Sequence, residues 1–207
     1  MALLDMLAGE LLGTKSVGEL SKSADASDGQ VRQLVTKALP LFLSGMYQNS
    51  STDKGAQSLE KALDDHAPNA EKSTSAMLRK ADIKDGEKIV RYVLGDNEEE
   101  VKKRLSQSTG LTQPQVSTLL SQLAPVILSL VGNYKQEENS TGKADSSNLI
   151  NVLGSALLGK DYQQVKPEKQ KGLNLMSLAG SLLGGSSQSN EQEGGVNLSG
   201  LLMNLLK

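Results

Sequence analysis

The fold class of this chain is decided by the stretch VKKRLSQSTGLTQPQVSTLLSQLAPVILSLVGN, residues 101–133. From Val116 to Val131 its apolar residues recur at gaps of three and four, which places them on one face of a helix. Thr112 stands where an N-cap stands, and Pro114 falls in the first turn, where its missing N–H costs little. We therefore expect a long helix that begins near Thr112.

A shorter helix precedes it over about Asn97 to Ser108 and ends at Thr109-Gly110, where glycine can adopt the left-handed conformation. Two helices joined by a tight turn form either a DNA-binding helix-turn-helix or a plain αα-corner. In the DNA-binding alternative, a helix-turn-helix-like unit at 101–122 contacts base edges through Gln113, Gln115, Thr118 and Gln122.

The charge of this unit argues against DNA binding. Between Gln113 and Gln122 there is no Lys or Arg, although phosphate neutralisation normally supplies most of the non-specific affinity. The cations at 102–104 follow three glutamates at 98–100, which offset them. We therefore favour a packed structural corner and keep nucleic-acid binding as the alternative.

Pro125 lies in the middle of the expected long helix. It removes one backbone hydrogen bond, so the sequence predicts either a kink or a division into two helices at Leu123–Ala124. A kink here would turn the apolar half, Val126 to Val131, into a core.

The same element recurs upstream, where the matching residues all lie at one constant offset along the chain and differing apolar positions stay apolar. The identical pairs include Leu20-Ser21 with Leu105-Ser106, Gln30-Val31 with Gln115-Val116, Pro40 with Pro125, and Leu43-Ser44 with Leu128-Ser129. A match without gaps that includes the mid-helix proline indicates an internal repeat. The first copy has Ala24-Asp25 in place of the turn glycine. We predict a duplicated helical domain over 1–134, with halves at about 1–66 and 82–134 and a Pro-kinked long helix in each.

The composition favours helices and excludes several kinds of site. Aromatic residues make up 2% of the 207 residues and strand formers are scarce, so the core must consist of Leu, Val, Ile, Ala and Met. The absence of cysteine excludes disulfides and thiolate zinc sites. A net charge of −2 gives no reason to expect nucleic acid or an anionic membrane as an obligatory partner. We expect an all-α fold, with further helices at about 3–13, 17–23, 28–47 and 55–65, around Met77 and Leu78, and from Ile89 into Gly95.

The amino-terminal stretch at 1–13 lacks a basic region and includes Asp5 and Glu10, which argues against a secretory signal. No apolar stretch approaches the ~20 residues that a membrane span needs. We expect a cytoplasmic protein without a membrane span.

After Tyr134 the composition changes, and we expect a linker at 135–148 and then a flexible Leu/Gly/Ser-rich tail at 149–207. Three short amphipathic helices are predicted in the tail, at 149–158, 173–183 and 196–206. Isolated helices of this length are marginal in water, so they must dock on the main body, on another chain or on a membrane surface. We favour docking or self-association, because their polar faces lack the Lys and Arg typical of membrane-surface helices.

One of these segments resembles the start of the chain. The sequence LAGELLG at 7–13 recurs as LAGSLLG at 178–184. The tail segment therefore carries the same leucine spacing as the amino-terminal helix that we expect.

Catalytic signals are weak. His66 follows Asp64 and Asp65, and such a run could bind a metal, but a single imidazole at a helix end more often interacts with the helix dipole. No phosphate-binding loop, dinucleotide fingerprint or nucleophile elbow is present. We therefore predict no catalytic, cofactor-binding or metal residue, and expect a non-enzymatic protein that interacts with itself or another protein through its carboxyl-terminal helices.

The stretch DGEKIVRYVLGDNEEEV at 85–101, then STGL at 108–111 and LLSQLAPVILSLVGN at 119–133, resembles the bacterial family named domain of unknown function 937. The shared features stand at Asp85-Gly86, Ile89, Gly95, Gly110-Leu111 and Leu123-Ala124-Pro125. Arg91-Tyr92 departs from the Gly-His pair of many members. The resemblance implies an all-helical bacterial protein with no assigned activity. Distantly similar YidB-type proteins have a homeodomain-like helix arrangement, which by itself does not fix a function.

Overall fold

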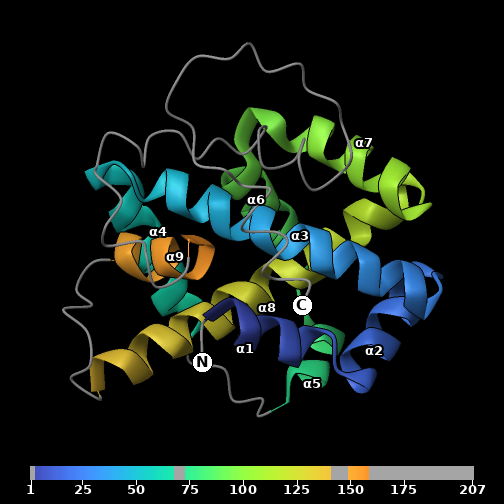
Figure 1. Ribbon diagram of the computed structural model, residues 1–207, viewed down its shortest axis with the longest axis horizontal. Helices are drawn as coiled ribbons and strands as arrows, with labels where there is room; N and C mark the ends of the chain where they lie inside the picture. The colour runs from blue at the N-terminus through green and yellow to red at the C-terminus, as the bar shows by residue number, and fades with distance from the viewer. Residues whose placement is uncertain (1–2, 68–72, 141–148, 159–207) are drawn as a thin grey trace.

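The computed structural model describes residues 3–67, 73–140 and 149–158, which form helices with no strand among them (Figure 1). The helices are α1 Leu3–Leu11, α2 Thr14–Ala24, α3 Asp28–Asn49, α4 Asp53–His66, α5 Thr74–Lys80, α6 Ile83–Leu94, a 3-10 turn η1 Gly95–Asn97, α7 Glu98–Thr109, α8 Gln113–Ser140 and α9 Leu149–Leu158. The predicted all-α fold is confirmed.

The chain contains two three-helix units, α1–α3 and α6–α8, and the sequence match covers the last two helices of each. At the offset that aligns Gln30 with Gln115, α2 and α3 correspond to α7 and α8. α2 packs against α8 as well as α3, and α7 packs against α3 as well as α8. The middle helix of each unit therefore packs against the long helices of both units. The two related halves expected from the sequence stay a prediction, with which these reciprocal contacts agree.

The two long helices begin with the same cap. Ser27 Oγ accepts a hydrogen bond from Gln30 N at 3.3 Å, and Thr112 Oγ1 accepts one from Gln115 N at 3.4 Å. In return, the side-chain oxygen of each glutamine accepts from the backbone N–H of its cap residue, at 3.2 and 2.9 Å. This reciprocal pair is a capping box, which satisfies amides that have no partner inside the helix. The predicted N-cap at Thr112 is thus confirmed.

The turns before the two long helices also have the same backbone conformation. Gly110 closes α7 with φ 70°, and Asp25 closes α2 with φ 49° and ψ 54°. Both are left-handed, and aspartate is one of the few non-glycine residues that adopts this conformation with modest strain. The missing glycine in the first copy therefore does not change the turn.

α8 continues through Pro125 without division, so the alternative of two helices separated at Leu123–Ala124 is wrong. Proline has no N–H to donate to the carbonyl of Ser121 in the preceding turn, so that carbonyl is left free within the helix. α8 also runs past Tyr134 as far as Ser140. The first part of the linker expected at 135–148 is therefore helical, and Lys135 Nζ lies 3.2 Å from Glu60 Oε1 of α4.

By length and composition, α8 over Gln113–Glu137 could cross a membrane, which corrects the expectation that no apolar stretch has this size. In the structure, 72% of its most apolar window is buried inside the protein. Packing at the centre of the fold accounts for its apolar sequence.

Glycines let α6 lie close to both long helices. A Cβ placed on Gly86 of α6 would stand 1.7 Å from the carbonyl oxygen of Ser121 on α8. A Cβ on Gly45 of α3 would stand 2.3 Å from the carbonyl oxygen of Val93 on α6. Real side-chain atoms do not approach backbone this closely, so each crossing requires glycine.

The segment Leu149–Leu158 is helical as predicted, and it belongs to the main body (Figure 1). Val152, Leu153 and Ala156 are buried in the same core cluster as α1 and α3. The predicted helices at 173–183 and 196–206 lie outside the described residues.

Candidate functional site

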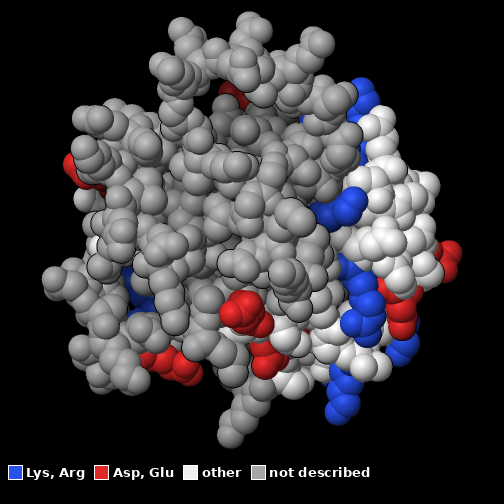
Figure 2. Space-filling view, in the orientation of Figure 1, with Lys and Arg blue, Asp and Glu red and all other residues white. Residues whose placement is uncertain are grey.

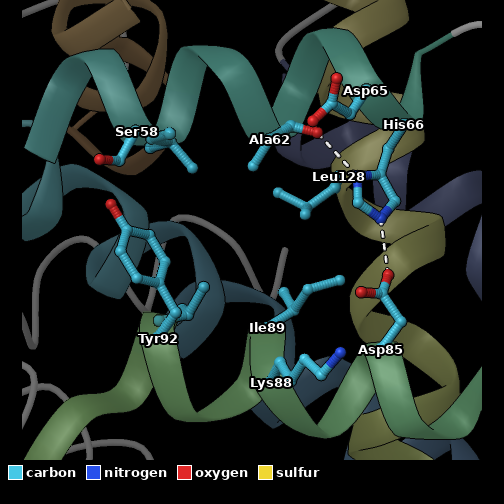
Figure 3. A pocket seen from close by; sticks show the side chains of 11 residues that line it. Ser58, Ala62, Asp65, His66, Asp85, Lys88, Ile89, Tyr92 and Leu128 are labelled. Carbon is cyan, nitrogen blue, oxygen red and sulfur yellow. Dashed lines mark hydrogen bonds and ion pairs between the residues drawn. The ribbon is translucent and has the colours of Figure 1, made fainter.

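A cleft of about 310 Å³ opens between α4 and α6 (Figure 3). Its apolar lining consists of Leu59, Ala62, Ile89, Val93 and Leu128. Its polar lining consists of Ser58, Asp65, His66, Asp85, Lys88 and Tyr92. Leu128 comes from α8, so the cleft is a space between two helices that is closed by a third.

Helix ends fix the polar groups at one end of the cleft. Thr52 caps the start of α4, and Asp82 caps α6 by accepting a hydrogen bond from Asp85 N at 3.2 Å. As a result Asp85 lies in the first turn of α6, while His66 is the last residue of α4. A carboxylate at a helix N-terminus and an imidazole at a helix C-terminus both suit the helix dipole. The prediction that His66 stands at a helix end is confirmed.

His66 ties the two walls of the cleft together. Its Nε2 lies 2.9 Å from Asp85 Oδ2, and its Nδ1 lies 2.7 Å from the carbonyl oxygen of Ala62 (Figure 3). Both partner atoms are oxygen acceptors, and which ring nitrogen donates depends on the tautomer of His66. The pair therefore joins the end of α4 to the start of α6.

Tyr92 occupies the other end of the cleft, beside Ser58 (Figure 3). Its hydroxyl donates to the carbonyl oxygen of Gly55 at 3.2 Å, and its side chain is 40% exposed. Burial raises the pKa of Tyr92 above the ordinary value of 10.0, and a hydrogen bond with Ser58 opposes this rise. At neutral pH the phenol therefore stays protonated and keeps its donor role.

These groups do not form a catalytic triad. In a Ser-His-Asp triad, one imidazole nitrogen faces the serine and the other faces the carboxylate. The two nitrogens of His66 face Ala62 and Asp85, and Ser58 lies at the opposite end of the cleft (Figure 3). Among residues 3–67, 73–140 and 149–158, no three His, Cys, Asp or Glu side chains converge as possible metal ligands. The cleft offers an apolar floor with a polar rim, which suits a docked side chain or helix.

The four candidate DNA-contacting residues are not displayed together. Gln122 is 5% exposed, its Nε2 donates to the carbonyl oxygen of Leu78 at 2.8 Å, and its oxygen accepts from the Ser23 hydroxyl. It is a core residue, which corrects its assignment to a base edge. Gln113 is exposed and Thr118 is half-buried.

Gln115 has its side chain engaged at the junction of the two units. Its Nε2 donates to the carbonyl oxygens of Ala24 at 3.0 Å and Asp25 at 2.8 Å. In the equivalent position of the other unit, Gln30 Nε2 donates to the carbonyl oxygen of Gly110 at 3.0 Å. Each glutamine thus donates to the turn that precedes the long helix of the other unit. This shared contact explains why both copies have glutamine at this position.

The charges beside this unit are largely paired within α7. Lys102 Nζ lies 2.5 Å from Glu98 Oε1, and Arg104 Nε lies 2.7 Å from Glu100 Oε1. Figure 2 shows Lys and Arg on the side of α2, α3 and α7, with Asp and Glu among them. Such a mixed surface gives little of the phosphate attraction on which DNA binding depends.

Sequence reasoning missed the cleft. His66 and Asp85 are 19 residues apart, and neither sequence neighbourhood indicates that the two helix ends meet. Lys88 and Tyr92 stand at i and i+4, so the sequence could predict that they share a helix face. It could not predict that this face lies opposite α4. Only the packing of α4 and α6 on α8 brings these groups together.

The fold and the site define an all-helical protein in which the α2–α3 and α7–α8 pairs have matching sequences, with a small cleft between α4 and α6. A family model described as bacterial protein of unknown function, DUF937, matches residues 5–134. The chain belongs to this bacterial family, and the match spans both units. No curated protein and no solved structure matches the chain.

Proposed function

We propose that this protein is a non-enzymatic interaction module of the cytoplasm, which assembles with itself or with another protein through its Leu-rich carboxyl-terminal segments. The proposal is supported by the packing of α9 against the main body. α9 is the one of the three predicted carboxyl-terminal helices that lies within the described residues.

α9 acts as a docking helix. Val152, Leu153 and Ala156 are 8%, 0% and 7% exposed, and the helix packs against α1, α3 and α4. A free helix as short as α9 is marginal in water, so it owes its stability to this packing. The segments 173–183 and 196–206 have similar length and leucine content, and they need an apolar partner surface for the same reason.

The cleft supports the non-enzymatic part of the proposal. His66 has both nitrogens engaged, and Ser58 of the cleft lies at the far end from it. The residues around His66 are accounted for by helix capping and by the link between α4 and α6.

Light scattering on the full chain tests assembly. We expect a mass above the 21.9 kDa of one chain, and a return to one chain when Leu201→Asp places a charge in the apolar face of 196–206. Asn204→Asp adds the same charge in the same segment at a polar position, and should leave the mass unchanged. A truncation after Leu158 keeps every described helix and should also be monomeric. A full chain that is already monomeric, with no partner recovered, would contradict the proposal.

DNA binding is the alternative, and it would have to rest on Gln113 and Thr118, because Gln115 and Gln122 are engaged elsewhere. A gel shift on duplex DNA decides between them. Binding that weakens steeply with salt supports the alternative, and no shift at low salt removes it.

A further inference from the structure

We infer that the cleft between α4 and α6 is the docking site for residues 173–183 of the same chain. The inference concerns a surface distinct from the assembly proposed above, and it leaves 196–206 for the partner.

The rim of the cleft is exposed at Ser58, Lys88 and Tyr92, whereas its apolar floor is buried, with Leu59 and Leu128 each 1% exposed. The exposed large hydrophobic side chains of the described residues are Ile83, at 38%, and Tyr92, at 40%, and both lie on α6. Tyr92 lines the cleft itself, over a floor that includes Leu59 and Leu128. A volume of about 310 Å³ is at the lower end for small-molecule pockets and suits a few side chains of a docked helix.

The segment 173–183 has the sequence of a helix whose docking the structure already shows. α1 buries Leu4, Leu7 and Leu11 against the core, where they are 8%, 0% and 0% exposed. At a constant offset, the tail repeats Leu4, Leu7, Ala8, Gly9, Leu11, Leu12 and Gly13 of this region as Leu175, Leu178, Ala179, Gly180, Leu182, Leu183 and Gly184. Since Leu175, Leu178 and Leu182 lie at i, i+3 and i+7, they form one apolar stripe on a helix.

The α1 site itself is filled by α1, which presents Leu3 as a fourth buried leucine where the tail has Asn174. The tail copy would bind that site less well than α1 does, because it buries one leucine fewer. The cleft, whose rim is exposed, is a surface that no described helix fills, and we assign the segment to it.

The chain delivers this segment to the cleft. α9 packs against α4, which is one wall of the cleft, and residues 159–172 then separate α9 from the segment. A stretch of this length spans up to roughly 45–50 Å, which is ample for a site on an adjacent helix. The segment 196–206 follows on a much longer tether, so its effective concentration at the cleft is lower.

Charges flank both the segment and the rim of the cleft. Lys169 and Lys171 closely precede the segment, and the exposed Asp65 of the rim attracts them, whereas the exposed Lys88 of the same rim repels them, so the segment must enter from the side of Asp65. At a partly solvated rim such attraction mainly sets orientation and is weakened by salt.

Thiol labelling tests the site, because the chain contains no native cysteine. Lys88→Cys places a thiol on the cleft, and Lys22→Cys on α2 places an exposed thiol elsewhere. In the full chain with Leu178 intact, we expect the thiol at 88 to react at least about tenfold more slowly than in a Leu178→Asp background, as a tethered ligand at millimolar effective concentration implies. The thiol at 22 should react equally in both.

Further variants show whether the cleft is occupied by 173–183, by 196–206 or by a second copy of the chain. Ser187→Asp adds a charge outside the segment and should keep the protection, and so should a chain ending at residue 190, which lacks 196–206. Loss of protection in that shortened chain would assign the cleft to 196–206 and overturn the inference. Protection that grows with protein concentration would assign it to a second copy, and equal labelling with and without Leu178→Asp would show that the segment does not cover the cleft. The assembled mass is measured separately, so the failure of either proposal leaves the other testable.

Discussion

The crossing of α6 and α8 gives the sharpest prediction, which is that Gly86→Ala destabilises the protein. The new Cβ would stand 1.7 Å from the carbonyl oxygen of Ser121, and 2.6 Å from its carbonyl carbon. These are backbone atoms, so no rotamer change relieves the overlap, and α6 must retreat from α8 until the contact exceeds 3.0 Å. The retreat loosens the buried Ile89, Val90 and Val93 of α6.

The magnitude is a difference of two terms. Overpacking of a tight interface costs about 3 kcal/mol at the upper end of its usual range, which applies because both sides are backbone. Alanine in place of glycine within a helix returns about 1 kcal/mol. We therefore expect a net loss of about 2 kcal/mol, or a fall in Tm of roughly 4–8 °C for a chain of this size.

Urea unfolding followed by circular dichroism measures this loss, with Gly18→Ala as the matched control. Gly18 lies inside α2 and a Cβ there meets nothing within 4 Å, so the same substitution should stabilise the protein by up to about 1 kcal/mol. If Gly86→Ala proved as stable as Gly18→Ala, the close approach of α6 and α8 would be refuted.

Three further predictions test other parts of the structure. Gln115→Ala should lower the free energy of unfolding in urea by about 1–2 kcal/mol, because it removes half of a capping box and the hydrogen bonds to the other unit. Gln113→Ala, at an exposed position, should change it by less than about 0.5 kcal/mol. Ser129→Ala should be neutral or stabilising by up to about 1 kcal/mol, because the buried Ser129 hydroxyl has no hydrogen-bond partner among the described residues; a clear loss would show that it has one. Because the pKa of Tyr92 is raised in the folded protein, its contribution to the free energy of unfolding is fully present below pH 10 and is lost as the pH rises through the raised pKa. Tyr92→Phe should therefore flatten the fall in stability above pH 10. An unchanged dependence of stability on alkaline pH would contradict this.

The repeat shows how far sequence reasoning reaches. The constant offset between matching residues predicts two related halves. The capping residues at the start of α8 could be predicted because a cap depends on neighbours within one helical turn. The same reasoning misplaced Gln122, which lies on the candidate base-reading face by helix periodicity and is buried by α5 and α2. Local periodicity defines a face of a helix but does not say what covers it.

By itself, then, the sequence determined the helices, their caps and their duplication, since these follow from interactions within about one helical turn and from a comparison of the chain with itself. Only the tertiary structure decided that Gln30 and Gln115 exchange contacts between the units, that α9 joins the core, and that His66 meets Asp85 across a cleft. The physical reason is that each of these contacts joins residues far apart in the chain. Their meeting depends on how apolar faces are buried against one another, and the glycine crossings of α6 set how closely they approach.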